Sequence, residues 1–252
     1  SLRKISKETG VHIVSSTGYY MPFTLSDTVK KMSIREMVDK IVKEIEIGYD
    51  GTDIKAGIIG EVGAVGEMDE FEKKILEATA IAQKITGAAV TLHTACPNVI
   101  YSSEHNLSWG QRTQWVLDYL ERCNADLSRV IVGHADVDVK TTIQEHIEVL
   151  KRGAVLEYDN FGQEHAYDNE NTYGFSDWQR VQNIAYLINC GYVDQLILTT
   201  DLWQKIQYTE YGGWGFAHIK ENICPMLLKN GVTEQQLQRM LVKTPQRLLE
   251  IK

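Results

Sequence analysis

The sequence is short of three things: paired cysteines, positive charge and long apolar runs. Its four cysteines stand singly and fit neither a zinc-binding spacing nor a disulfide framework, which indicates a reducing compartment. Lysine and arginine number 26 against 34 for aspartate and glutamate, and the net charge of −8 argues against a nucleic-acid-binding protein, since such proteins concentrate positive charge. No apolar run approaches the roughly 18 residues that cross a bilayer, and the chain opens on the polar stretch SLRKISKETG. We therefore expect a cytoplasmic protein without a membrane partner.

A glycine-rich stretch early in the sequence also lacks the G-x-G of a dinucleotide-binding loop. Residues 57–66 read GIIGEVGAVG, and one acid, Glu61, stands where a phosphate would have to approach. The stretch is apolar enough to be buried. An unpaired buried carboxylate is costly, so it neutralises, pairs or binds a metal. We therefore expect Glu61 to be a buried acid with a partner.

What the sequence does contain is a regular alternation of apolar, β-branched runs and amphipathic stretches. The predicted strands lie within 11–20, 55–63, 88–95, 129–136, 154–162 and 195–203. The predicted helices are 33–48, 70–87, 108–123, 142–153 and 176–191, with two short ones in 234–252. Strict alternation predicts a parallel sheet covered by helices, which also explains why the strands are apolar almost throughout.

A closed barrel of alternating strands and helices needs eight strands, and only six are visible. The first residues, LRKISKETG, have the pattern of the second half of a helix that leads into the first run. We therefore expect an α/β fold, a TIM (β/α)8 barrel whose first two βα units are missing from this chain. Residues 1–252 would then form a single barrel domain, with strands 3 to 8 and the C-terminal helices.

Four polar residues share one position, at the C-terminal end of an apolar strand. Glu61 follows GIIG, His93 follows VTL, His134 follows VIVG and Asp201 follows LILTT. In a parallel barrel these strand ends meet on one face, where active sites are built. Two imidazoles and two carboxylates suit Zn²⁺ and its neighbours. One such histidine is more simply a core residue, but four metal-type ligands at four strand ends favour a metal site.

These motifs carry a family resemblance that spans the whole chain. GIIGEVG, LHTACP, VGHADVD and TTDLW, in this order, resemble the phosphotriesterase family of the amidohydrolase superfamily. STGYY at 16–20, LEYDNFG at 156–162 and YGGWGFAHI at 211–219 are most similar to its phosphotriesterase-related, resiniferatoxin-binding-like branch. The resemblance implies a (β/α)8 barrel of the metal-dependent hydrolase type that holds two divalent metal ions, most simply zinc, with manganese, cobalt or iron as alternatives.

The resemblance also implies a role for each ligand. His93 and His134 would bind one metal, Asp201 the other, and Glu61 would bridge both, where many relatives use a carboxylated lysine. The implied function is hydrolysis of an ester, lactone, amide or phosphoester bond of a small molecule by a metal-activated hydroxide, with Asp201 as the catalytic proton acceptor. The family's first strand supplies an H-x-H pair that this sequence does not contain. That absence agrees with the missing strand.

Other polar and aromatic residues near the strand ends are weaker candidates. For the substrate pocket they are Tyr19, Tyr20, Asp159 and Trp203. Each has a structural role as its alternative. Asp136 and Asp138 either orient the ring of His134 or cap a loop. His146 lies within a predicted helix, where we expect it on the solvated face.

Two other functions stay open. A TatD-type deoxyribonuclease resembles this pattern in using a glutamate, two histidines and an aspartate at the same barrel strands, but the sequence has no basic stripe and STGYY and YGGWG argue against it. A catalytically incomplete binding relative becomes the better hypothesis if the H-x-H pair is truly absent. For the leading hypothesis we expect a small-molecule substrate, no nucleic acid, and a homodimer as an option that no stretch of the sequence proves.

Overall fold

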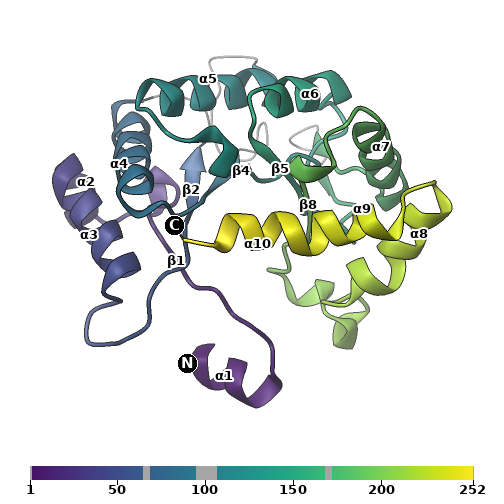
Figure 1. The fold of residues 1–252 in the computed structure, drawn as a ribbon, viewed down its shortest axis with the longest axis horizontal. Helices are drawn as coiled ribbons and strands as arrows, with labels where there is room; N and C mark the ends of the chain where they lie inside the picture. Colours follow the sequence, from purple (N-terminus) through teal and green to yellow (C-terminus); the bar gives the residue numbers. More distant parts are fainter. Residues whose placement is uncertain (1, 65–68, 95–106, 168–171, 252) are drawn as a thin grey trace.

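The computed structural model describes residues 2–64, 69–94, 107–167 and 172–251 (Figure 1). One parallel sheet has the order β1-β2-β3-β4-β5-β8. Its strands are β1 (Ser16–Thr17), β2 (Ile58–Ala64), β3 (Val90–Thr94), β4 (Val130–Val132), β5 (Val155–Tyr158) and β8 (Leu196–Leu198). A separate antiparallel hairpin joins β6 (Ala166–Tyr167) to β7 (Thr172–Tyr173). The predicted α/β architecture with six parallel strands is confirmed, and β1 and β8 are not paired in the described residues.

The helices lie between the strands as the alternation predicted. They are α1 (Leu2–Thr9), α2 (Asp27–Lys31), α3 (Ile34–Glu46), α4 (Glu70–Thr86), α5 (Trp109–Arg122), α6 (Ile143–Lys151), α7 (Asp177–Asn189), α8 (Cys224–Lys229), α9 (Glu234–Gln238) and α10 (Thr244–Leu249). Figure 1 shows α3 to α7 in an arc around the strands, with α8 to α10 in yellow. Five of these helices, α3, α5, α6, α7 and α9, begin at a capping box, a local signal that is readable in the sequence. No helix in the described part of the chain combines the length and the apolar character that a bilayer crossing needs.

The first predicted strand is much shorter than expected. Residues 11–14 are extended but exposed, and pairing with β2 begins only where Gly57 N donates to Ser15 O at 2.9 Å. The physical reason is that the partner strand β2 starts at Ile58, so no described strand lies alongside residues 11–14 to pair with them. The preceding helix α1 forms as predicted, has no buried residue and stands apart from the body of the molecule in Figure 1.

The two faces of the sheet carry different cores. The main core lies between the sheet and the surrounding helices and contains Ile59, Leu92, Val132 and Leu156 among many others. The other face, called here the inner face, carries a small cluster. Its buried members are Ala89, Ile131, Val155, Ile197 and, from α10, Leu248. Successive strand residues point to opposite faces, so the residues two positions further along each strand extend the inner face toward the C-terminal strand ends.

Gly60 in β2 shows why this stretch is rich in glycine. Its φ is +139°, and a Cβ atom there would overlap the carbonyl oxygen of Thr91 on β3. We expect Gly60→Ala to lower the free energy of unfolding by about 3 kcal/mol, because it combines backbone strain with a clash against main chain that cannot move aside. Urea unfolding of the variant measures this.

The matched control is Gly153→Ala. Gly153 also has a positive φ, +91°, but its added Cβ atom would meet nothing within 4 Å. We expect a loss of roughly 1 kcal/mol there, from backbone strain alone. Equal losses in the two variants would show that the close approach of β2 to β3 does not matter.

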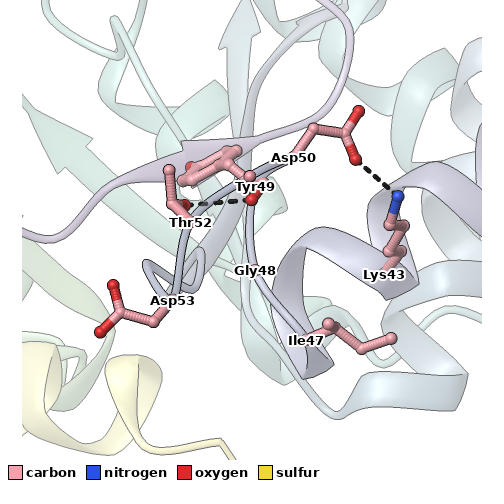
Figure 2. A pocket seen from close by; sticks show the side chains of 8 residues that line it. Lys43, Ile47, Gly48, Tyr49, Asp50, Thr52 and Asp53 are labelled. Atoms are coloured by element: carbon pink, nitrogen blue, oxygen red, sulfur yellow. Dashed lines mark hydrogen bonds and ion pairs between the residues drawn. The ribbon is translucent and has the colours of Figure 1, made fainter.

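The surface also has an open depression of about 500 Å³, lined by Lys43, Ile47 and residues 48–53 (Figure 2). Its charged groups are already paired: Lys43 Nζ lies 2.5 Å from Asp50 Oδ1, and Asp53 pairs with Arg3. The loop 48–53 precedes β2, so the depression lies at the N-terminal edge of the sheet, opposite the strand ends that carry the predicted ligands. It therefore has no part in the predicted metal site.

Candidate metal centre

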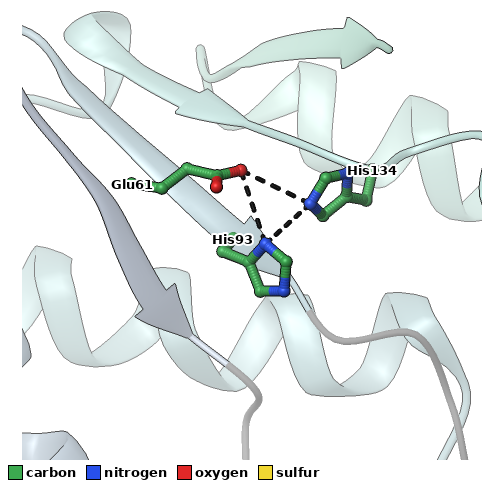
Figure 3. A group of neighbouring side chains, drawn as sticks. All are labelled: Glu61, His93 and His134. Atoms are coloured by element: carbon green, nitrogen blue, oxygen red, sulfur yellow. Dashed lines mark hydrogen bonds and ion pairs between the residues drawn. The ribbon is translucent and has the colours of Figure 1, made fainter. Parts of the chain in front are cut away.

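Three of the four predicted ligands converge on one point. One donor atom from each of Glu61, His93 and His134 lies within 4.8 Å of the other two (Figure 3). His134 Nε2 is 2.7 Å from His93 Nδ1, and Glu61 Oε1 is 3.4 Å from each of these nitrogens. Two imidazole nitrogens and one carboxylate oxygen that face each other form a set of borderline ligands for a divalent cation.

Glu61 reaches this group because β2 is irregular. The pairing register shifts between Ile59 and Val62, which are both in the main core, so the backbone between them turns the Glu61 side chain toward the histidines. The prediction of a buried Glu61 is wrong, since its side chain is 40% exposed. The residues on either side of Glu61 are buried, and their apolar character made burial of Glu61 plausible. The Glu61 side chain itself remains partly exposed.

The charges in the group support one another. Partial shielding from water raises the pKa of Glu61, but hydrogen bonds from His134 and His93 outweigh this and hold the pKa at about 2. Burial lowers the pKa of His134, while the charges of Asp159 and Glu61 raise it well above its ordinary value. A proton on His134 Nε2 has to leave before this nitrogen can bind a metal ion.

Asp159 fixes the ring of His134 from behind. Its Oδ2 accepts a hydrogen bond from the His134 backbone N at 2.7 Å and lies 3.0 Å from Nδ1 of the same residue. Donation from Nδ1 to Asp159 leaves Nε2 facing Glu61 and His93, the arrangement by which carboxylates orient metal-binding histidines. Asp159 is 3% exposed, so this contact, which strand-end placement did not predict, adds an orienting role to its predicted pocket role.

Asp201 lies near the group but outside it. Burial raises the pKa of its carboxyl to about 6, and the charges of Asp159 and Glu61 raise it as well, while His134 opposes them. Both Asp201 and His134 have positive φ, 39° and 57°, which is uncommon for residues other than glycine and recurs at functional sites. The strand ends after β4 and β8 therefore share a strained backbone.

Strand alternation separates the two tyrosines after β1. Tyr20 points to the group, with its hydroxyl 3.1 Å from His93 Nε2 and its ring edge-on to that imidazole. Tyr19 points the other way into the main core, where its hydroxyl lies 4.0 Å from Met32 Sδ, and burial raises its pKa to about 12. The structure therefore brings Tyr20, and not Tyr19, to the site. Trp203 follows Asp201 and is 63% exposed.

Glu157 was missed in the sequence. It lies on β5 two residues before Asp159. A Cβ atom added at Gly133 would lie 3.7 Å from Glu157 Oε2 and 3.3 Å from Asp159 Oδ2, so the two carboxyl groups face the same point. Burial raises the pKa of Glu157 to about 8, and the charge of Asp159 adds to this. The signal was available: with a period of two, Glu157 shares a face with Asp159, and an acid inside an apolar strand needs an explanation just as Glu61 does.

The two loop acids, Asp136 and Asp138, make different contacts, and His146 lies elsewhere than expected. Asp136 is fully buried and orients the end of β5, because its carboxylate accepts a hydrogen bond from the backbone N of Asp159 at 3.0 Å. Asp138 caps the loop, accepting from Lys140 N at 2.9 Å. The expectation of a solvated His146 is wrong, because it is fully buried, with Nε2 against Ala135 O at 2.8 Å, and burial lowers its pKa to about 4.

None of the cysteines in the described part of the chain belongs to the group. The free cysteines of the described chain are Cys123, Cys190 and Cys224. Cys96, close to His93 in sequence, lies outside the described residues. Among the described residues the centre therefore consists of imidazole and carboxyl groups.

Comparisons with known proteins all point in one direction. A model of the phosphotriesterase family matches residues 1–249. The chain is 38% identical over 257 residues to the N-acetyltaurine hydrolase of Danio rerio, covering 100% of this chain and 69% of that protein. It is 34% identical to a phosphotriesterase-related protein of Nematostella vectensis over 254 residues, with the same coverage of both. The solved structure of a resiniferatoxin-binding protein from Rhodobacter sphaeroides matches with a TM-score of 0.88 at 31% identity, covering 99% of this chain and 66% of that one.

Proposed function

Since the chain belongs to the phosphotriesterase family, as its motifs predicted, we propose that it is a binuclear metal-dependent hydrolase that cleaves the amide bond of a small N-acyl compound. The observation that carries the proposal is the convergence of Glu61, His93 and His134. The amide class is supported by the relatives of this chain that are named N-acetyltaurine hydrolases.

The donor set fits a divalent cation. Glu61 Oε1, His93 Nδ1 and His134 Nε2 face a common point, and Asp159 behind His134 supplies the carboxylate that such a ligand needs. Zinc is the metal that these ligands suit best. Asp201 would hold the second ion, with Glu61 shared between the two. When bound, the metals supply Lewis-acid polarisation of the scissile group and activation of water.

The chain's own residues divide the remaining work. Asp201 accepts the proton of the attacking water and passes it to the leaving nitrogen. Its raised pKa of about 6 suits this task, because a group that both accepts and donates a proton works best when its pKa is near the working pH. Tyr20, with its hydroxyl beside His93, donates a hydrogen bond to the acyl group. Trp203, exposed next to Asp201, covers the apolar part of the substrate.

The proposal includes the fold. Residues 1–252 form a single domain that supplies strands 3 to 8 of a (β/α)8 barrel, and the positions of strands 1 and 2 in such a barrel lie between β1 and β8. Two features support this: the described sheet is open there, and its inner face already carries an apolar layer of the kind that fills barrel interiors.

The test is metal content and substrate range, measured on the same purified chain. We expect bound zinc by elemental analysis and release of acetate from N-acetyltaurine that stops after chelation and returns with zinc. A chain without bound metal would contradict the hydrolase proposal. Faster cleavage of a lactone or a phosphotriester would keep the metal-dependent hydrolase and overturn the amide class.

The two alternatives predict other outcomes in the same assay. Cleavage of DNA would favour the TatD-type nuclease, which the family match and the net charge of −8 leave without support. Bound N-acetyltaurine without turnover would favour the incomplete binding relative.

A further inference from the structure

We propose that Arg180 in α7 is a positioning residue that holds both His134 and Asp201 in place through two separate chains of hydrogen bonds. The inference rests on the proposed function, because it concerns the geometry of the same ligands. Arg180 touches neither of them. Its side chain and that of Asp136 are completely buried, so their contacts are made without competition from water.

The first chain of contacts leads to His134. Arg180 Nε donates to Asp136 Oδ2 at 2.5 Å. The same carboxylate accepts from the backbone N of Asp159 at 3.0 Å and of Asn160 at 3.1 Å, which fixes the end of β5. The side chain that projects from this end, Asp159, holds both the backbone N and the Nδ1 of His134. Arg180 therefore determines where the ring of His134 points.

The second chain leads to Asp201. Arg180 Nη2 donates to the carbonyl oxygen of Gln163 at 2.9 Å. The side-chain Nε2 of Gln163 in turn donates to the carbonyl oxygens of Thr200 at 2.8 Å and Asp201 at 2.9 Å. The backbone at the end of β8 is thus fixed by the same guanidinium that fixes the end of β5.

Both chains end on backbone with an unfavourable conformation. His134 has a φ of 57° and Asp201 a φ of 39°. Strained backbone persists only where its surroundings over-determine it. The hydrogen bonds to His134 N and Asp201 O are contacts of that kind, and Arg180 stands behind both. Its own orientation is locked on the far side by Asp177, whose Oδ1 accepts from Nη1 at 3.1 Å.

A lysine cannot replace this arginine. Three nitrogens of one planar group serve Asp136, Gln163 and Asp177 in different directions, whereas an ammonium group has a single nitrogen. The conservative variant R180K keeps the positive charge and removes the three separately directed N–H donors of the guanidinium group. It therefore separates a positioning role from simple charge compensation of Asp136.

The experiment compares R180K with R129K. Arg129 is also a buried arginine, and it donates to three main-chain carbonyls, those of Arg247, Leu248 and Glu250, at the opposite edge of the sheet. We measure zinc affinity by chelator competition, the absorption spectrum of the cobalt-substituted protein, and the ring signals of His134 by NMR in the metal-free protein. We expect R180K to weaken zinc binding by roughly 10- to 100-fold and to change the cobalt spectrum and the His134 signals. R129K should lower Tm and leave all three unchanged.

A second variant decides the matter if R180K does not fold. Gln163 is only partly buried, and Q163A breaks the chain to Asp201 alone. We expect it to fold, to weaken zinc binding by about tenfold and to change the cobalt spectrum, with the His134 signals in place. Wild-type zinc affinity and spectrum in a folded R180K, or in Q163A where R180K fails to fold, would overturn the inference.

The proposed function can fail independently of this inference. If the wild-type chain binds no zinc, the proposed function is wrong. The His134 ring signals of the metal-free protein then decide the positioning role: a change in R180K and none in R129K supports it, and no change in either overturns it.

Discussion

Replacing His134 with alanine is expected to weaken zinc binding by roughly a thousandfold. This is more than the 10- to 100-fold loss expected when a residue that only hydrogen-bonds to a metal ligand is removed. The substitution removes one of three converging donors and leaves Glu61 and His93 as the remaining pair. Hydrolysis should fall with the metal. Zinc content after dialysis against a weak chelator, and acetate release from N-acetyltaurine, measure the two effects.

Stability has to be followed in the same variant. Asp159 is buried and loses the ring that faces it, which is expected to cost about 1–3 kcal/mol in the metal-free protein. His12→Ala is the matched control, because His12 is exposed and lies in the extended segment before β1. It should bind zinc as the parent does. If the His134 variant kept the parent's zinc content, His134 would not be a ligand.

Replacing Glu157 with glutamine is expected to stabilise the metal-free protein at high pH. The pKa of this acid is raised from 4.5 to about 8, chiefly by burial. Between these two values the unfolded chain has released its proton and the folded chain has kept it, so stability falls as the pH rises. The variant has no such proton to lose. Relative to the parent it should gain about 4 kcal/mol between pH 5 and pH 9, or roughly 8–16 °C in Tm.

Two controls identify the cause of this gain. Glu148→Gln removes an exposed carboxylate from α6 and should leave the pH dependence of the parent unchanged. Saturating zinc should shrink the difference between the Glu157 variant and the parent, since a cation near Glu157 favours its carboxylate form. A pH profile that is the same in parent and variant would show that Glu157 titrates as an ordinary exposed acid.

The position of the candidate ligands could be predicted because it depends on local pattern. Each strand is an apolar run, each helix an amphipathic one, and the end of a run is visible in the sequence. Parallel strands present these ends at one edge, so Glu61, His93 and His134 could be placed together before any contact was known. Asp201 was placed at the same edge and lies beside the group, within reach of its charges.

The errors have a common origin in long-range packing. A helical pattern does not say which neighbour a side chain meets, so His146 was expected in solvent although Tyr158 from β5 and Ala135 enclose it. The exposure of Glu61 depends on a register shift between β2 and β3, which local propensity does not encode.

The sequence by itself determined the fold class, the strand ends and the chemical type of the site, since all three follow from the period of apolar residues and the residue that closes each run. Only the tertiary structure decided which groups act on one another. Arg180 lies 44 residues from Asp136, and Glu157 becomes a perturbed acid only through the charges and burial around it. Such pairings arise when separate elements pack in one register, and the low dielectric of the packed interior is what gives them their strength.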